Sequence, residues 1–127
     1  VGAGLDLATG ETTCAVIGNS GITEHPDTGA LIAGRQIPRW PYLLDFAARC
    51  HELTGLGYIG VDIVLDRDKG PMLLELNVRP GLNIQIANRC GLRDRLKIIE
   101  AQPDGVGVAE RVAFSMGSLL QPATAAH

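Results

Sequence analysis

Residues 57–83 read GYIGVDIVLDRDKGPMLLELNVRPGLN, and this stretch decides the fold. Residues 57–65 and 72–79 are β-branched or aliphatic runs, and the turn-forming sequence DRDKGP joins them. Two such runs around a short polar connection are typical of a β-hairpin. We therefore expect the two runs to pair as antiparallel strands.

Hydrophobic alternation sets the register of this hairpin. Large apolar side chains fall at every second position of each run: Ile59, Val61, Ile63 and Leu65 in the first, and Met72, Leu74, Leu76 and Val78 in the second. A shift of one residue moves a strand's side chains to the other face. Only every second register therefore places the apolar side chains of both strands on the same face of the hairpin. A four-residue loop at 67–70 meets this condition. It places Asp62 opposite Glu75. It also places Gly60 opposite Asn77.

The other face of the hairpin has the chemistry of a magnesium site. Directly opposed side chains have Cβ atoms roughly 4.5–5.5 Å apart, so the carboxylates of Asp62 and Glu75 repel each other unless a cation lies between them. Asn77 shares the face of Glu75, and an oxygen-only donor set is what Mg²⁺ prefers. Arg79 continues this face, where a guanidinium can bind phosphate or carboxylate. The alternative is an ordinary solvated sheet face, but apolar side chains that we expect on the same face, Leu73 among them, argue against it.

Short strands and helices are predicted on both sides of the hairpin. β-like stretches occupy 3–8 and 12–17, and turn sequences follow them at 18–21 and 25–29. One amphipathic helix spans about 40–54, with Pro41 in its first turn and Gly55 at its end. Shorter helices are expected near 84–90, from about 92, and near 109–119. Since no linker or repeat divides the chain, we expect residues 1–127 to form a single α+β unit, an antiparallel sheet packed with helices.

The composition excludes several classes of protein. A content of 46% hydrophobic and 20% charged residues is typical of a globular domain, and the net charge of −3 gives no attraction for nucleic acid. No apolar run approaches the ~20 residues needed to cross a bilayer, so we expect no membrane partner. Cys14, Cys50 and Cys90 form no CxxC pair, which favours reduced thiols in a cytoplasmic protein over a disulfide or zinc site. His25, in the turn HPDTG, is a candidate substrate contact, although turn histidines are more often merely exposed.

The hairpin resembles the last strands of the ATP-grasp superfamily. There, an Asp on one strand and a Glu-x-Asn pair on the next hold the magnesium ions that bridge the phosphates of ATP. The resemblance makes Asp62, Glu75 and Asn77 the ligands of Mg²⁺ or Mn²⁺, and Glu75 and Asn77 thereby bind ATP as well. It makes Arg79 a catalytic residue at the acyl phosphate. Leu74 becomes a candidate contact beneath adenine, although the alternation places it on the core face.

Sequences outside the hairpin resemble one branch of that superfamily, the α-L-glutamate-ligase-like proteins related to the ligases that add glutamate to a ribosomal protein. The stretches that carry this resemblance are GLDLATGETT, HPDTG, QIPRW and LNIQIANRCGL. It implies the C-terminal portion of an ATP-dependent ligase that converts a small-molecule or peptide carboxylate to an acyl phosphate, which an amine then attacks. The family's phosphate-binding lysines and glycine-rich loop have no counterpart here, since Lys69 and Lys97 are the only lysines. We therefore expect the lobes that carry them to precede Val1, and residues 1–127 alone to be inactive.

Two other functions stay open. One is a non-catalytic module of the same fold that binds a nucleotide or a partner, and the other is an ATP-grasp kinase. The opposition of Asp62 and Glu75 argues against the first, because a scaffold has no need to oppose two carboxylates. Phosphate release that depends on an amine would separate a ligase from a kinase. A Rossmann or P-loop site is excluded, since GAG at 2–4 and GVGV at 105–108 lack the GxGxxG pattern and the P-loop lysine.

Overall fold

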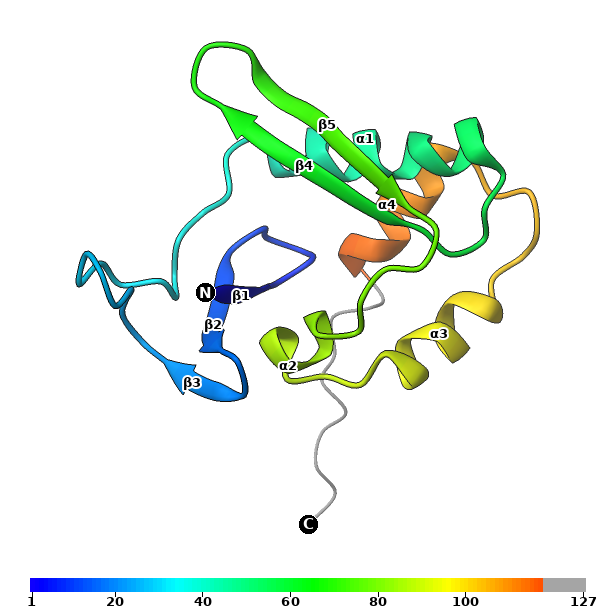
Figure 1. Cartoon of the computed structure of the whole chain (residues 1–127). Helices are drawn as coiled ribbons and strands as arrows, with labels where there is room; N and C mark the ends of the chain where they lie inside the picture. Colours follow the sequence, from blue (N-terminus) through cyan, green and yellow to red (C-terminus); the bar gives the residue numbers. More distant parts are fainter. Residues whose placement is uncertain (118–127) are drawn as a thin grey trace. The chain divides into compact units, whose positions relative to one another are not determined.

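The computed structural model describes residues 1–117 and divides the chain into two compact units (Figure 1). Within the described residues, one unit combines residues 1–38 with residues 82–117, and the other is Arg39–Gly81. The described elements are α-helices and two small antiparallel sheets, so the α+β class is confirmed. Instead of one sheet, each unit holds a sheet of its own. That the units together make a single domain stays a prediction.

The larger unit is built on a three-stranded sheet. β1 (Gly2–Leu5), β2 (Thr12–Ile17) and β3 (Ser20–Ile22) pair antiparallel in that order. The first two were predicted, whereas β3 forms in a segment whose glycines and asparagine predicted only a turn. α2 (Ile84–Asn88) packs against β1 and β2. The buried apolar side chains of this unit are Ala15, Val16 and Ala87.

Small side chains let α2 approach the sheet closely. A Cβ placed on Gly4 would lie 2.5 Å from the carbonyl oxygen of Ala87, so no larger residue fits there. Two hydrogen bonds join the same surfaces: the backbone N–H of Leu5 donates to Asn88 Oδ1 (3.1 Å), and Cys14 Sγ donates to the Ala87 carbonyl (2.8 Å). The half-buried thiol of Cys14 is therefore a structural donor.

Two further helices belong to this unit. α3 (Leu92–Glu100) begins at the predicted residue, and α4 (Val108–Gly117) begins one residue before the helix predicted near 109–119. The last two residues of the helix predicted at 109–119 lie outside the described part of the chain. No helix within residues 1–117 is long and apolar enough to cross a membrane.

The smaller unit holds one helix and the hairpin. α1 (Trp40–Thr54) has the predicted bounds, with Pro41 in its first turn. Gly55 ends it with a left-handed φ of 67°, and its N–H donates to the His51 carbonyl at 2.7 Å. The hairpin consists of β4 (Gly60–Asp66) and β5 (Gly70–Asn77), and Figure 1 draws α1 behind it. The buried side chains of α1 are Trp40, Leu43 and Cys50.

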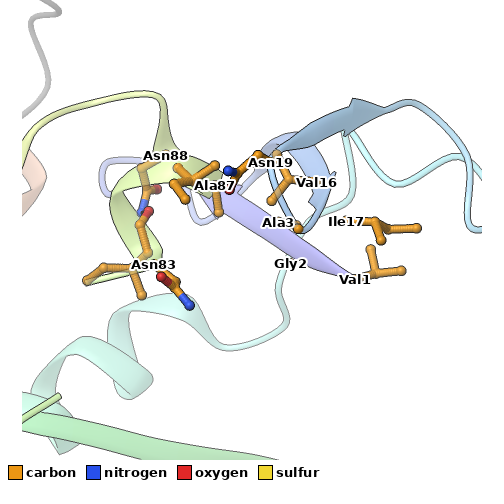
Figure 2. A pocket seen from close by; sticks show the side chains of 12 residues that line it. Val1, Gly2, Ala3, Val16, Ile17, Asn19, Asn83, Ala87 and Asn88 are labelled. Carbon is orange, nitrogen blue, oxygen red and sulfur yellow. The ribbon is translucent and has the colours of Figure 1, made fainter. Parts of the chain in front are cut away.

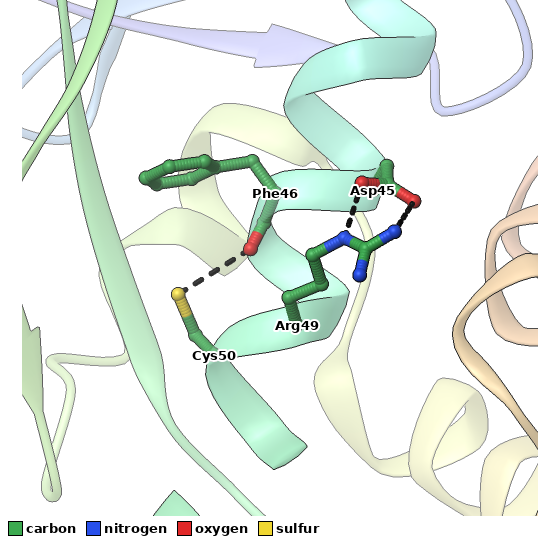
Figure 3. Close-up of polar contacts among 4 residues, drawn as sticks. All are labelled: Asp45, Phe46, Arg49 and Cys50. Atoms are coloured by element: carbon green, nitrogen blue, oxygen red, sulfur yellow. Dashed lines mark hydrogen bonds and ion pairs between the residues drawn. The ribbon is translucent and has the colours of Figure 1, made fainter. Parts of the chain in front are cut away.

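On the solvent-facing side of α1, an ion pair joins two residues that lie one helical turn apart. Arg49 Nε donates to Asp45 Oδ2 at 2.7 Å, and the hydrogen bond to Asp45 raises the pKa of Arg49 (Figure 3). On the same helix, Cys50 Sγ donates to the Phe46 carbonyl at 3.4 Å. Exposed pairs at this spacing stabilise a helix only slightly, so the pair supports α1 locally and carries no chemistry.

Candidate functional site

The hairpin brings together the carboxylates that the sequence predicted to be neighbours. In the antiparallel ladder of β4 and β5, Asp62 lies directly opposite Glu75. Gly60 lies directly opposite Asn77, two positions along the same face. Both carboxylates are exposed and Asn77 is half-buried. The predicted register at this end of the hairpin is therefore confirmed.

A β-bulge shifts the register in the other half of the hairpin. Beyond Asp62, Ile63 pairs with Leu73 and Val64 pairs with Met72, so the pairing there differs by one residue from the prediction. Leu74 is the extra residue on β5. Leu73 therefore shares the face of the half-buried Ile63, and the prediction that it lies on the carboxylate face is wrong.

The tip of the hairpin explains why the register shifts. Asp66 pairs with Gly70, which leaves a three-residue loop at 67–69 in place of the predicted four. Asp66 Oδ1 accepts hydrogen bonds from the N–H groups of Asp68 (2.9 Å) and Lys69 (2.8 Å), and both lower the pKa of the Asp66 carboxyl. Gly70 takes a left-handed φ of 77°. The three-residue tip shifts the pairing by one residue from the predicted register. The bulge at Leu74 restores the predicted register at Glu75.

The bulge also changes the position of Leu74. Its side chain is 70% exposed, so the prediction that it lies on a core face is wrong. A residue that a bulge places outside the ladder does not follow the strict alternation of a strand. The exposed side chain is accessible to a ligand, and its contact with adenine stays a prediction.

The chain turns sharply where β5 ends. The strand stops at Asn77, two residues earlier than predicted, so Arg79 lies in a bend beyond it. The backbone N–H of Arg79 donates to Asn77 Oδ1 at 3.0 Å. The exposed side chain of Arg79 therefore extends from a turn that is tied to Asn77, and its catalytic role stays a prediction.

The donor set fits a hard divalent cation. Across residues 1–117, no group of three or more His, Cys, Asp or Glu side chains gathers around one point. Asp62, Glu75 and Asn77 instead offer two carboxylates and one carboxamide. Mg²⁺ is commonly bound by one or two carboxylates, with waters and substrate phosphates as its remaining ligands. The set thus suits an ion shared with a polyphosphate.

A separate pocket of about 410 Å³ opens in the larger unit (Figure 2). Its walls come from β1, the turn between β2 and β3, and α2, and its polar side chains are Asn19, Asn83 and Asn88. The amide of Asn88 is already engaged, since its Oδ1 accepts from Leu5 and its Nδ2 donates to the Ile84 carbonyl. None of the predicted site residues lines it, and its lining side chains supply no carboxylate for a metal.

Other residues noted in the sequence lie outside the hairpin. His25 lies in its predicted turn, where its Nδ1 accepts from the Asp27 N–H at 3.3 Å. On α3, Lys97 Nζ lies 3.8 Å from Asp94 Oδ1. Cys14, Cys50 and Cys90 are free, as predicted.

The comparisons with known proteins identify the class of fold. Residues 1–101 match the family model described as sugar-transfer associated ATP-grasp, and this match covers most of the 127 residues. The chain belongs to this ATP-grasp family, which implies ATP as its nucleotide. Neither the curated proteins nor the solved structures gave a match. The superfamily prediction is confirmed, whereas the α-L-glutamate-ligase-like branch is not and stays a prediction.

Proposed function

We propose that Asp62, Glu75 and Asn77 hold Mg²⁺ or Mn²⁺ against the phosphates of ATP in an ATP-dependent carboxylate–amine ligase of the glutamate type. The observation that carries this proposal is the direct opposition of two exposed carboxylates across β4 and β5. Like charges directly opposed destabilise a sheet, so the free hairpin bears a strain that a bound cation relieves.

The geometry suits one ion or two adjacent ions. Opposed Cβ atoms lie roughly 4.5–5.5 Å apart, and Mg²⁺ lies about 2.1 Å from each oxygen ligand, so one ion fits between the side chains of Asp62 and Glu75. Asn77 adds a neutral oxygen on the same face. When bound there, the ion neutralises the charge that develops on the transferred γ-phosphoryl group.

The remaining residues take supporting roles in this proposal. The exposed guanidinium of Arg79 would bind the acyl phosphate, and the exposed side chain of Leu74 would contact adenine. Lysines for the α- and β-phosphates come from other lobes of the same protein, because Lys69 lies in the hairpin tip and Lys97 faces Asp94. The substrates react with each other, and no residue of the hairpin acts as a nucleophile.

Mn²⁺ binding tests the metal site directly. We expect Glu75→Gln to weaken Mn²⁺ binding in the presence of ATP by at least about tenfold. Electron paramagnetic resonance of Mn²⁺ measures this affinity. The matched control is Glu52→Gln, which makes the same change at an exposed position of α1 and should leave the affinity unchanged. Equal affinity in the Glu75→Gln variant and the wild type would exclude the site.

The reaction is tested separately with the active protein. A ligase releases phosphate from ATP only when both the carboxylate and the amine are present. Phosphate retained on the product in the absence of an amine would instead identify a kinase.

A further inference from the structure

The chain beyond β5 folds back over the start of β4, and Gly60 leaves the space for it. A Cβ placed on Gly60 would lie 2.8 Å from Pro80 Cβ and 3.5 Å from Asn77 Cβ. Non-bonded carbon atoms pack best at about 3.5–4.0 Å. The proline ring therefore occupies the space that any side chain at position 60 would need.

The turn that Pro80 closes is the same turn that orients the Asn77 side chain. Asn77 Oδ1 accepts a hydrogen bond from the backbone N–H of Arg79, and Pro80 follows at once. Proline has a fixed φ, so its ring cannot rotate away from a neighbour as a flexible side chain can. A carbonyl oxygen has two lone pairs, and the hydrogen bond from Arg79 leaves one of them for a cation.

We propose that Gly60 is a positioning residue of the metal site, an inference that rests on the proposed function. Its missing side chain allows Pro80 to pack on β4, and this contact fixes the turn that holds the Asn77 carboxamide on the face of Asp62 and Glu75. A methyl group at position 60 would push the ring away by about 0.7 Å or more to reach an ordinary carbon contact. Ligand distances in metal sites lie within about 0.2 Å of their usual values, so a shift of this turn would misplace the Asn77 oxygen.

The first test compares two glycines of the same segment. Gly60→Ala should weaken Mn²⁺ binding in the presence of ATP by about 10–100-fold, the usual effect of lost support behind a ligand. Gly57→Ala should leave it unchanged, because a Cβ on Gly57 meets nothing within 4 Å. A folded Gly60→Ala protein with a lower melting temperature but wild-type Mn²⁺ affinity would show a merely structural role and overturn the proposal.

The second test removes the other half of the contact. Pro80→Gly should also weaken Mn²⁺ binding, and adding Gly60→Ala to it should cause no further loss, because the ring that the methyl group displaces is gone. Fully additive losses would overturn the proposal. If Gly60→Ala does not fold, Pro80→Gly alone tests the proposal, because Pro80 lies beyond β5 and its replacement leaves the strands unchanged. Wild-type Mn²⁺ affinity in Pro80→Gly would then reject the inference.

Glu75→Gln separates the two proposals. Unchanged Mn²⁺ affinity in Glu75→Gln rejects the metal site itself, and the positioning role with it. A loss in Glu75→Gln without a loss in Gly60→Ala and Pro80→Gly rejects only the positioning role.

Discussion

Replacing Glu75 with Gln should stabilise the protein without magnesium and remove the stabilisation that magnesium gives. The substitution keeps the shape of the side chain and removes one of two charges on directly opposed positions. Two unit charges about 5 Å apart in water repel by about 0.8 kcal/mol. For a chain of this size, relief of that repulsion raises the melting temperature by about 2–5 °C.

The assay is thermal unfolding followed by circular dichroism at low ionic strength, with chelator or with excess Mg²⁺. Wild type should gain stability from Mg²⁺ by mass action, and the Glu75→Gln variant should gain little. Glu52→Gln is the control, since Glu52 lies near the Arg49 guanidinium and its removal should not stabilise. In 1 M salt, where charges are screened within about 3 Å, the metal-free gain of Glu75→Gln should disappear. A lower melting temperature for Glu75→Gln in chelator would refute the reasoning.

Three further predictions concern the same hairpin and the whole chain. Asn77→Ala should reduce ATP turnover of the active protein by about 10–100-fold with the fold intact, and full turnover at ordinary magnesium would contradict the assignment. Residues 1–127 alone should bind ATP only in the presence of Mg²⁺, with a Kd of roughly 1 mM, which corresponds to a binding free energy of about 4 kcal/mol. Calorimetry measures this Kd, and a micromolar value would show that the site is complete within these residues. Because hydrogen bonds from the backbone lower the pKa of Asp66, its stabilising contribution is present above about pH 4 and is lost as the pH falls through the folded pKa. Asp66→Asn should therefore flatten this acid dependence in thermal unfolding, and an unchanged profile would argue against the tip hydrogen bonds.

The candidate site could be predicted because it depends on local alternation. Asp62 and Glu75 lie in strands whose apolar residues recur at every second position, and this periodicity fixes which side chains share a face. The tip could not be predicted from alternation, because its length depends on Asp66 accepting two backbone hydrogen bonds and on Gly70 taking a positive φ. The bulge at Leu74 compensates for the wrong tip length, so the predicted pairing of Asp62 with Glu75 is still correct. The hydrophobic alternation of the sequence does not indicate a bulge at this position.

The rest of the fold shows the same division between local and distant causes. α1 was predicted with its bounds because helical spacing, Pro41 and Gly55 all act within the segment. β3 was missed because Ser20 and Gly21 are typical of a turn, and the segment forms a strand by pairing with β2. The close approach of Pro80 to Gly60 joins the turn beyond β5 to the start of β4, so neither residue alone predicts it.

The bulge at Leu74 joins two registers within one hairpin, because the pairing shifts by one residue between Asp62 and Ile63. Without it, a change of one residue in the tip loop would propagate along the ladder and turn Glu75 away from Asp62. With it, the three-residue tip is compatible with the pairing of Asp62 and Glu75, and a tip one residue longer would keep that pairing without a bulge. Among related proteins, a tip one residue longer should therefore occur together with loss of the bulge, and the positions of Asp62 and Glu75 should stay opposed.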